Sequence, residues 1–507
     1  MSGIVYLIGA GPGDYKLITV KGRECVEKAD VIVYDYLADE KILRWAKPEA
    51  ELIYAGKMVN NHTLTQDEIN AVLVEKGLEG KIVARLKGGD PLVFGRGGEE
   101  ALALREAGIP FEFVPGVTSG ISAPAYAGIP VTHRNLATSF AIVTGHENPN
   151  KPGESIHWEH LAKAVDTISF VMGVGNLPHI TEELRKYGRP ENTPVAVIRW
   201  GTKGEQETIV SDLAHIAEEV EKAKLQPPAI VIVGEVVALR PQLQWFDTKP
   251  LFGKKVVVTR ARSKASALVE KLESLGADVI EAPAIETVPL PVTEEMKATL
   301  EHLDEFKTLI FTSAEGVRYF FDELFKEGLD VRKLHGLKIT AIGSGTAKAL
   351  KGFGVLADIL PANYQAESVV EALEPIVMEG EKVLLVQPVV ARSVIPDGLR
   401  AFGAEVEVFR MYETKQSTVG SEKLAEELAL CNVDYITFTS SSTVTNTLKL
   451  LGENGPALVK NAKVVAIGPI TAATAYEYGV SADIVAPTFT VDAMVDAIME
   501  DLGKKDN

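Results

Sequence analysis

Short apolar runs rich in β-branched residues alternate with longer segments of helical periodicity along the whole chain. Runs of this kind occupy residues 4–11, 81–89, 167–175 and 255–261. Strands that alternate with helices are typical of α/β units built on mainly parallel sheets. We therefore expect an α/β protein, and a chain of 507 residues is too long for a single core.

The clearest break in this pattern lies at residues 239–255, LRPQLQWFDTKPLFGKK. An apolar run ends there, two prolines and a bulky loop follow, and a new strand pattern begins at Lys255. The segment before the break still exceeds one ordinary unit, so we expect it to contain two subdomains. The predicted domains are residues 1–245, divided into subdomains of about 1–131 and 132–245, and residues 254–502.

The second half contains an internal repeat. Residues 309–324, LIFTSAEGVRYFFDEL, are echoed at 435–451, YITFTSSSTVTNTLKLL. Residues 337–361 are echoed in the same way at 462–487. A repeat of this length predicts two similar α/β lobes, one opening near residue 255 and the other near 290.

Composition narrows the classes of function. The formal net charge of −18 argues against nucleic acid as a partner, because nucleic-acid binding needs a clustered basic face. An anionic substrate would have to be held by local groups of Arg and Lys. With only Cys25 and Cys431, and no histidine pair at metal-ligand spacing, we expect neither a disulfide framework nor a metal site.

No apolar run is long enough to span a bilayer, the longest being residues 228–239. The first residues, MSGIVYLIGAGPGD, lack a basic region and lead directly into a glycine turn, which indicates a buried strand rather than a signal peptide. We expect no membrane association and a reducing cytoplasm as the location.

The glycine turn at residues 9–14 resembles a dinucleotide-binding fingerprint but departs from it. Asp14 stands where the third glycine of that pattern would pack the helix on the strand, and Pro12 removes a backbone N–H. A nicotinamide oxidoreductase is therefore disfavoured. A turn for another ligand and a purely structural turn both remain open.

Residues 85–100, RLKGGDPLVFGRGGEE, form a denser signal. Five glycines within eleven positions allow a ligand to lie directly against the backbone, and Asp90 could accept hydrogen bonds from its amine or hydroxyls. Three cations, Arg85, Lys87 and Arg96, are interleaved as an anionic substrate would require. The alternative is a glycine-rich surface loop with solvated charges, which is the less common arrangement.

These segments occur in order with several others, at residues 31–40, 55–70, 114–134, 170–180 and 194–209. Together they resemble the uroporphyrinogen-III C-methyltransferases of the tetrapyrrole methylase family over about residues 3–245. The resemblance implies that S-adenosylmethionine binds folded between two α/β subdomains. The implied cofactor residues are Pro12, Gly88, Gly89, Asp90, Val93, Thr118, Ser119, Met172 and Gly201.

The same resemblance implies that Asp35 is a proton acceptor, that Lys57 is a proton donor, and that Arg96 and Glu99 hold the tetrapyrrole. Methylation of a pyrrole carbon requires an aligned methyl donor and then loss of a proton, which suits these residue types. The chain departs from the family at Met58, where an Arg is usual, so one contact to a substrate carboxylate is expected to come from elsewhere.

The second half resembles uroporphyrinogen-III synthase in residues 253–287, in the two FTS segments and in residues 408–415, VFRMYETK. The resemblance implies two α/β lobes joined by two strands, with lobe one at 254–287 plus 415–502 and lobe two at 290–412. It also implies that Tyr412 assists departure of the hydroxyl of a linear hydroxymethylbilane, without a cofactor.

Substrate carboxylates would be bound in the cleft between the lobes, by hydroxyl and N–H groups at strand ends and helix N-termini. Each FTS segment could instead serve only as a helix N-cap. The candidate substrate-binding residues are Thr259, Arg260, Ser313, Ser344, Thr439, Ser440, Ser441, Ile470 and Thr471.

The two resemblances imply consecutive steps: hydroxymethylbilane is closed to uroporphyrinogen III, which is then methylated twice to precorrin-2. A separate dehydrogenase and chelatase would act next, toward sirohaem or cobalamin, and we keep a homodimer through the first half as a hypothesis. Two alternatives remain open at this point. The first half could methylate a later corrinoid precursor, and the second half could be a non-catalytic bilobed binding module.

Overall fold

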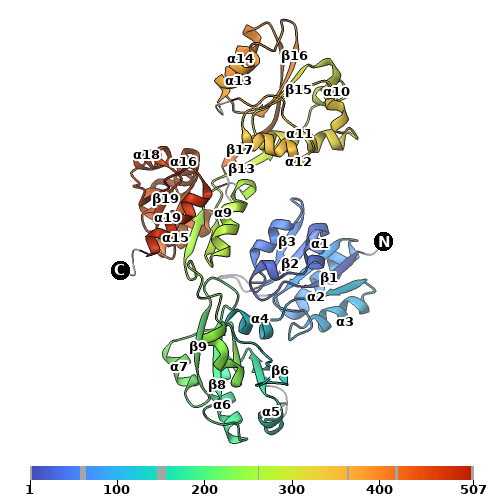
Figure 1. Cartoon of the computed structure of the whole chain (residues 1–507). Coiled ribbons are helices and arrows are strands. Elements are labelled where there is room, and N and C mark those ends of the chain that lie inside the picture. Colours follow the sequence, from blue (N-terminus) through green and yellow to red (C-terminus); the bar gives the residue numbers. More distant parts are fainter. Residues whose placement is uncertain are drawn as a thin grey trace. The chain divides into compact units, whose positions relative to one another are not determined.

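The computed structural model describes residues 3–56, 64–145, 156–260, 262–361, 365–416 and 421–503, and within them the strands form five-stranded sheets joined by helices (Figure 1). The α/β prediction is confirmed. The chain divides into two compact units, and the division runs through helix α9. The first unit comprises Met1–Lys255 and Lys271–Val279, and the second comprises Val256–Glu270 and Ile280–Asn507.

The first sheet has the order β3-β2-β4-β1-β5, and its strand pairs are all parallel. Successive residues of β1 face opposite sides, so that Leu7 packs in one apolar cluster and Ile8 in another. Burial on both sides explains why these strands are continuous apolar runs. The elements are β1 (Ile4–Gly9), α1 (Val20–Lys28), β2 (Val31–Tyr34), β3 (Glu51–Tyr54), α2 (Gln66–Leu78), β4 (Ile82–Lys87), α3 (Gly97–Glu106) and β5 (Phe111–Val114).

The second sheet has the order β6-β7-β10-β8-β9 and departs from the mainly parallel pattern. Only β6 and β7 pair in parallel, whereas β10 lies antiparallel to both β7 and β8. An apolar run looks the same in either direction, so the sequence did not distinguish the two. The elements are β6 (Phe140–Thr144), α5 (Trp158–Ala164), β7 (Thr167–Val171), α6 (Leu177–Lys186), β8 (Pro194–Arg199), β9 (Glu207–Asp212), α7 (Ile216–Lys222), β10 (Ala229–Val233) and α8 (Arg240–Leu243).

Helix α4 (Ser119–Tyr126) belongs with the second sheet. Its residue Ala123 packs in one apolar cluster with Val171 and Ile198. The chain therefore passes from the first sheet to the core of the second between Val114 and Ser119, upstream of the division expected near residue 131.

The third sheet, β12-β11-β18-β19-β20, draws its strands from two distant stretches of sequence. Strand β11 pairs in parallel with β18, which lies far along the chain. The elements are β11 (Lys255–Val258), α9 (Arg262–Ser274), β12 (Asp278–Glu281), α15 (Ser421–Ala429), β18 (Tyr435–Phe438), α16 (Ser441–Leu450), α17 (Gly455–Val459), β19 (Lys463–Ala466), α18 (Pro469–Glu477), β20 (Ile484–Val485) and α19 (Val491–Gly503).

The fourth sheet, β13-β17-β16-β14-β15, is built entirely from the intervening residues. Its strand pairs are parallel except for β13, which lies antiparallel to the long strand β17. The elements are β13 (Ile285–Pro289), α10 (Glu294–Glu301), β14 (Thr308–Phe311), α11 (Ala314–Lys326), β15 (Lys338–Ala341), α12 (Ser344–Gly352), α13 (Ala366–Leu373), β16 (Lys382–Pro388), α14 (Val394–Ala401) and β17 (Glu405–Gln416).

The internal repeat corresponds to a repeated arrangement of elements. Strand β14 leads through an FTS segment into α11, and β18 does the same into α16. In each case the next strand, β15 or β19, pairs in parallel beside it. Short 3-10 helices lie at Tyr15–Leu17, Glu40–Trp45, Val174–Asn176, Glu235–Leu239, Leu303–Glu305, Val331–Leu334 and Gly452–Asn454.

Candidate active sites

Three glycines bring the backbone together where β1, β4 and β5 end. A Cβ on Gly116 would lie 2.3 Å from the carbonyl oxygen of Gly89 and 2.6 Å from Cα of Gly9. Gly89 also donates its N–H to the carbonyl of Gly11 over 2.7 Å. Because carboxyl ends of parallel strands meet at one edge of a sheet, where ligands bind in α/β folds, we take these turns as the floor of one candidate site.

Residues 88–90 offer a backbone surface on this floor. Gly89 has a φ of +69°, and a Cβ there would only touch the backbone of Thr118 and Ser119, at 3.7 and 3.8 Å, so its backbone is not tightly covered. A Cβ on Gly88, by contrast, would lie 2.5 Å from Cβ of Leu37. Asp90 fixes the loop, since its carboxylate accepts from the N–H of Leu92 at 2.8 Å and of Gly116 at 2.9 Å.

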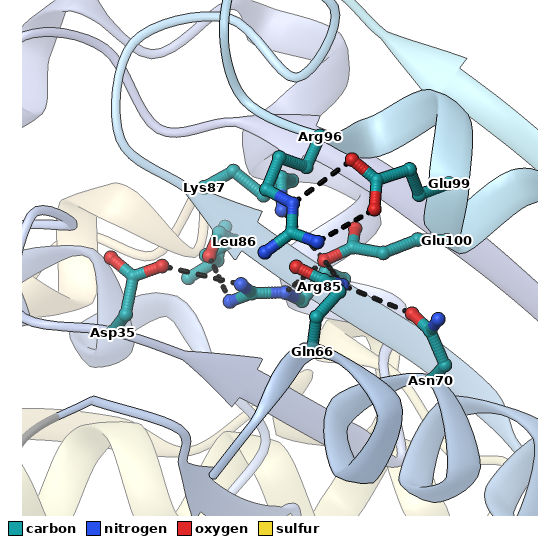
Figure 2. A network of polar contacts seen from close by, with 9 residues as sticks. All are labelled: Asp35, Gln66, Asn70, Arg85, Leu86, Lys87, Arg96, Glu99 and Glu100. Atoms are coloured by element: carbon teal, nitrogen blue, oxygen red, sulfur yellow. Dashed lines mark hydrogen bonds and ion pairs between the residues drawn. The ribbon is translucent and has the colours of Figure 1, made fainter. Parts of the chain in front are cut away.

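Asp35 follows β2, the neighbour of β4, and reaches the same edge. Its Oδ1 accepts from the N–H of Leu37 at 3.1 Å, and its Oδ2 lies 3.3 Å from a terminal nitrogen of Arg85. The Asp35 side chain is 22% exposed, whereas that of Arg85 is 3% exposed. Arg85 therefore contacts the carboxylate from its buried side, as Figure 2 shows, and the carboxylate remains partly exposed.

A second carboxylate, Glu100 of α3, lies on the other side of Arg85 (Figure 2). Its Oε1 accepts from Nζ of Lys87 at 2.6 Å, from Nε of Arg85 at 3.3 Å and from Nε2 of Gln66 at 3.3 Å. Lys87 is 5% exposed, and burial lowers its pKa. Two of the three cations expected to serve an anionic substrate are thus buried and paired within the protein.

Arg96 and Glu99 form an exposed ion pair at the N-terminus of α3. The guanidinium donates twice to the carboxylate, at 2.9 and 2.7 Å, and this bonding raises the pKa of Arg96 and lowers that of Glu99. Both side chains are more than half exposed. An exposed pair of this kind contributes only about 0–1 kcal/mol, so either partner could be exchanged for a charged ligand group.

Four hydrogen bonds close a ring between the segments that carry the other proposed cofactor residues. Tyr126 donates to the carboxylate of Asp14 at 3.0 Å, and the N–H of Asp14 donates to the hydroxyl of Thr202 at 2.9 Å. The N–H of Thr202 donates to Gln206 at 3.0 Å, and Gln206 donates to the carbonyl of Tyr126 at 3.4 Å. Burial raises the pKa of Tyr126, and the nearby negative charge of Asp14 raises it further.

This ring joins the segments that carry Pro12, Thr118, Ser119 and Gly201. Gly201 sits between Trp200 and Thr202, both with positive φ, and a Cβ on it would lie 2.5 Å from that of Ala123. Met172 follows β7 with a φ of +56° and is 55% exposed. Pro12 follows strand β1, and Val93 lies in the loop after β4. Thr118 and Ser119 lie at the start of α4. Lys57 and Met58 lie outside the described residues.

In the second half, Tyr412 forms the tightest polar contact among the predicted residues. Its hydroxyl lies 2.6 Å from Oγ of Ser313, and its ring packs against Tyr319 with centroids 5.6 Å apart. Tyr412 is only 4% exposed, and burial raises its pKa. Arg260 is half-buried, and burial lowers its pKa while the charge of Glu315 acts in the opposite direction.

Both FTS segments make the N-cap that their sequence allows. Ser313 accepts from the N–H of Gly316, and Ser440 forms a capping box with Thr443. Thr259 is fully buried and donates to the carbonyl of Thr437, so its hydroxyl joins two strands. Of the other candidates, Thr471 is buried, whereas Ile470 is 72% exposed. The hydroxyl of Ser441 accepts a hydrogen bond from that of Thr474. Ser344 is the first residue of α12, and Thr439 precedes Ser440, the N-cap of α16.

Several of these residues had no assigned role at the sequence level. Arg85 and Lys87 stand two apart in a strand, which places them on one face, but nothing in the sequence pointed to Glu100 as their partner. Among the described residues no group of three or more metal-ligating side chains is found, and no helix among them is long and apolar enough to cross a membrane.

Known protein families match the two halves separately. The tetrapyrrole (corrin/porphyrin) methylases match residues 4–217, and uroporphyrinogen-III synthase HemD matches residues 266–496. The "Porphyrin biosynthesis protein HemD" of Ruminiclostridium josui is 39% identical over 98% of this chain and 98% of its own length. The chain belongs to the family of fused tetrapyrrole methylases and uroporphyrinogen-III synthases.

Relatives of the methylase half alone are more similar. A uroporphyrinogen-III C-methyltransferase of Priestia megaterium is 54% identical over 46% of this chain and 98% of its own length. Among solved structures, a uroporphyrin-III C-methyltransferase of Thermus thermophilus is 40% identical, with a TM-score of 0.41, and covers 49% of this chain and 99% of that chain.

Proposed function

We propose that the synthase half closes hydroxymethylbilane to uroporphyrinogen III and that the methylase half methylates this product twice to give precorrin-2. The observation that carries the proposal is the presence of both families in one chain, with a relative that matches along nearly its whole length. The product of one half would then be the substrate of the other.

S-adenosylmethionine is the proposed cofactor, and it supplies an electrophilic methyl group when bound. The residues of the methylase half fit such a ligand, since Gly88 and Gly89 carry no side chains and the backbone of Gly89 is not tightly covered by other protein atoms. Asp90 keeps acceptor capacity toward an amine or hydroxyl beyond its two backbone contacts. The proposed cofactor residues are Pro12, Gly88, Gly89, Asp90, Val93, Thr118, Ser119, Met172 and Gly201.

Asp35 is the proposed proton acceptor of the methylase, because it is a partly exposed carboxylate held in place by Arg85. Arg96 and Glu99 are the proposed contacts to the substrate carboxylates, and their exposed pair would open as Arg96 binds one of them. Lys57 remains the proposed proton donor on the strength of the resemblance alone.

In the synthase half, Tyr412 is proposed to donate its proton as the bilane hydroxyl departs. Ser313 supports the role, because its oxygen lies within hydrogen-bond distance of the Tyr412 hydroxyl. Burial and the raised pKa keep Tyr412 protonated, as a proton donor must be. The proposed cleft residues, with the side chains of Thr259 and Thr471 buried, are Thr259, Arg260, Ser313, Ser344, Thr439, Ser440, Ser441, Ile470 and Thr471.

We further propose a cytoplasmic location, a homodimer through the methylase half, and a separate dehydrogenase and chelatase for the next steps. The central test is incubation of the whole chain with hydroxymethylbilane and S-adenosylmethionine. A dimethylated product of the type-III isomer is expected. A methylase without synthase activity would favour the binding-module alternative, and methylation of precorrin-2 in preference to uroporphyrinogen III would favour the corrinoid alternative.

Tyr412→Phe is expected to slow cyclisation by about 10-fold or more, whereas loss of a full general acid or base usually costs 10²–10⁴-fold. The substitution removes one hydroxyl and leaves the ring on Tyr319, so folding should survive. Since the bilane closes in water to the type-I isomer, the ratio of type III to type I is the quantity to measure. Ser313→Ala is the matched variant, and an unchanged ratio in both variants would leave Tyr412 a structural residue.

Tyr126→Phe is expected to weaken binding of S-adenosylmethionine about 3- to 10-fold, because it opens the ring between Asp14, Thr202 and Gln206. One neutral-to-charged hydrogen bond contributes about 1.5–3 kcal/mol at most, part of which would appear as altered folding stability. Calorimetric titration measures the affinity. Tyr187→Phe, at the end of α6, is a control outside this ring. Equal affinity in the two variants would contradict the role.

A further inference from the structure

Glu100 is a fully buried carboxylate that none of the proposed contacts with cofactor or substrate uses. It is 0% exposed, and its Oε2 has no hydrogen-bond partner among the described residues, whereas Oε1 accepts from three donors. Taking a carboxylate out of water costs several kcal/mol even when cations surround it. Replacing a whole buried ion group by well-packed apolar side chains is often neutral or stabilising, so stability alone does not explain why Glu100 and its two cations are placed here.

The buried charges form a row that ends at the site. Figure 2 shows Arg85 between two carboxylates, with Asp35 on one side and Glu100 on the other. One terminal nitrogen of Arg85 reaches Asp35, its Nε reaches Glu100, and its second terminal nitrogen donates to the carbonyl of Leu86 at 2.8 Å. The guanidinium is therefore fixed in place, and its positive charge is shared between two anions.

Lys87 competes with Arg85 for the same oxygen of Glu100. Its Nζ lies 2.6 Å from Oε1, closer than the 3.3 Å of Arg85. In a site of low dielectric constant, such competition determines how much of the charge of Arg85 remains for Asp35. The alternation of charge, from Asp35 through Arg85 and Glu100 to Lys87, makes each of the four sensitive to the next.

We propose that Glu100 and Lys87 are positioning residues that tune the basicity of Asp35 through the shared guanidinium of Arg85. The proposal rests on the proposed role of Asp35 as proton acceptor. Glu100 draws the charge of Arg85 away from Asp35 and so strengthens the base. Lys87 limits this effect, because its positive charge offsets part of the negative charge of Glu100.

Other charged or titratable groups near Asp35 act as a constant background in this comparison. Within the described residues, Tyr54 of β3 interacts with Asp35, and Glu40 and Tyr36 lie near Tyr54. Asp67, Arg96 and Glu99 lie on the other side of the row, near Glu100.

The two residues have opposite expected effects. Glu100→Gln keeps an oxygen toward Arg85 and Lys87 but removes a negative charge, so the carboxylate of Asp35 is stabilised and becomes a weaker base. In Glu100→Gln, the acidic limb of the plot of kcat against pH should therefore move to lower pH. The value of kcat at pH 7.5 should fall about 10-fold. Lys87→Met removes a positive charge, so its acid limb should move to higher pH without a comparable loss of kcat. Each shift should be on the order of one pH unit, as expected for one charge at an effective dielectric constant of about 20.

The experiment measures kcat for methyl transfer against pH in the full chain, with uroporphyrinogen III and saturating S-adenosylmethionine. The variants are Asp35→Asn, Glu100→Gln, Lys87→Met and the double variant Lys87→Met/Glu100→Gln. The double variant restores the charge balance and should return the limb toward its original position. It also decides the proposal if Glu100→Gln alone fails to fold. Affinity for S-adenosylmethionine should stay within about 2-fold in all four.

The outcomes separate this proposal from the one on which it rests. If Asp35→Asn retains the acid limb and most of its activity, Asp35 is not the base and its proposed role is wrong. If Asp35→Asn instead removes the acidic limb while Glu100→Gln and Lys87→Met shift it in the same direction or not at all, Asp35 remains the base. In that case only the proposed tuning by Glu100 and Lys87 is overturned. Glu100 would then be a structural partner of two buried cations.

Discussion

Asp35→Asn is expected to lower the rate of methyl transfer by about 10²-fold or more while binding of S-adenosylmethionine is retained. A general base usually contributes 10²–10⁴-fold, and an amide has nearly the shape of the carboxylate but cannot take up the proton. The N–H of Leu37 would keep an oxygen to donate to. The variant should therefore fold normally and lose the chemical step alone.

Single-turnover methylation of uroporphyrinogen III measures that step, and calorimetric titration measures the affinity for the cofactor. The synthase activity of the same polypeptide controls for loss or aggregation of the whole preparation, and retained affinity for the cofactor shows that the methylase half is folded. Turnover of Asp35→Asn within a few-fold of the original would show that the proton leaves by another route.

The second large effect is expected from Gly116→Ala. The new methyl group would lie 2.3 Å from the carbonyl oxygen of Gly89 and 2.6 Å from Cα of Gly9, and all of these are backbone atoms that cannot rotate away. Overpacking of this kind typically costs about 1–3 kcal/mol. For a unit of roughly this size the cost corresponds to a fall in Tm of about 3–10 °C. Methyl transfer should be lost as well, since the floor of the site is displaced.

Gly175→Ala is the matched control for this substitution. A Cβ at Gly175 would meet no atom within 4 Å, and its backbone requires no positive φ. Scanning calorimetry on both variants should show a lowered transition for Gly116→Ala and an unchanged one for Gly175→Ala. A methylase of normal stability and activity in Gly116→Ala would mean that the three backbones are not in contact.

Much of the architecture followed from local pattern. The β-branched runs located β1, β4, β7 and β11, and the duplicated FTS segments located the matching strands and helices of the second half. Pattern also suggested that each FTS serine could be an N-cap, because that role depends on the next three residues only. Strand direction in the second sheet escaped prediction, since an apolar run carries no sign of its polarity.

The candidate sites were predictable to the extent that their residues lie close in sequence. Gly88, Gly89 and Asp90 could be recognised as one ligand loop for that reason. The partnership of Arg85 with Asp35 and Glu100 could not be recognised, because it depends on the order of strands β2 and β4 and on the packing of α3. The same holds for Asp14, whose place in the glycine turn was seen as a departure from a pattern. In the structure, Asp14 instead forms hydrogen bonds with Tyr126 and Thr202, which lie far along the chain.

The interrupted third sheet has a consequence for the order in which the protein is made. Strand β11 ends at Val258, but its parallel partner β18 ends only at Phe438, and the whole of the fourth sheet is encoded between them. A ribosome that adds about 5–20 residues per second needs on the order of ten seconds or more to cover that distance. Before the end of this interval the fourth sheet is complete in sequence, whereas strand β11 has its neighbour β12 but still lacks β18. The nascent chain must therefore keep the other edge of β11 from pairing with other strands until β18 has been translated.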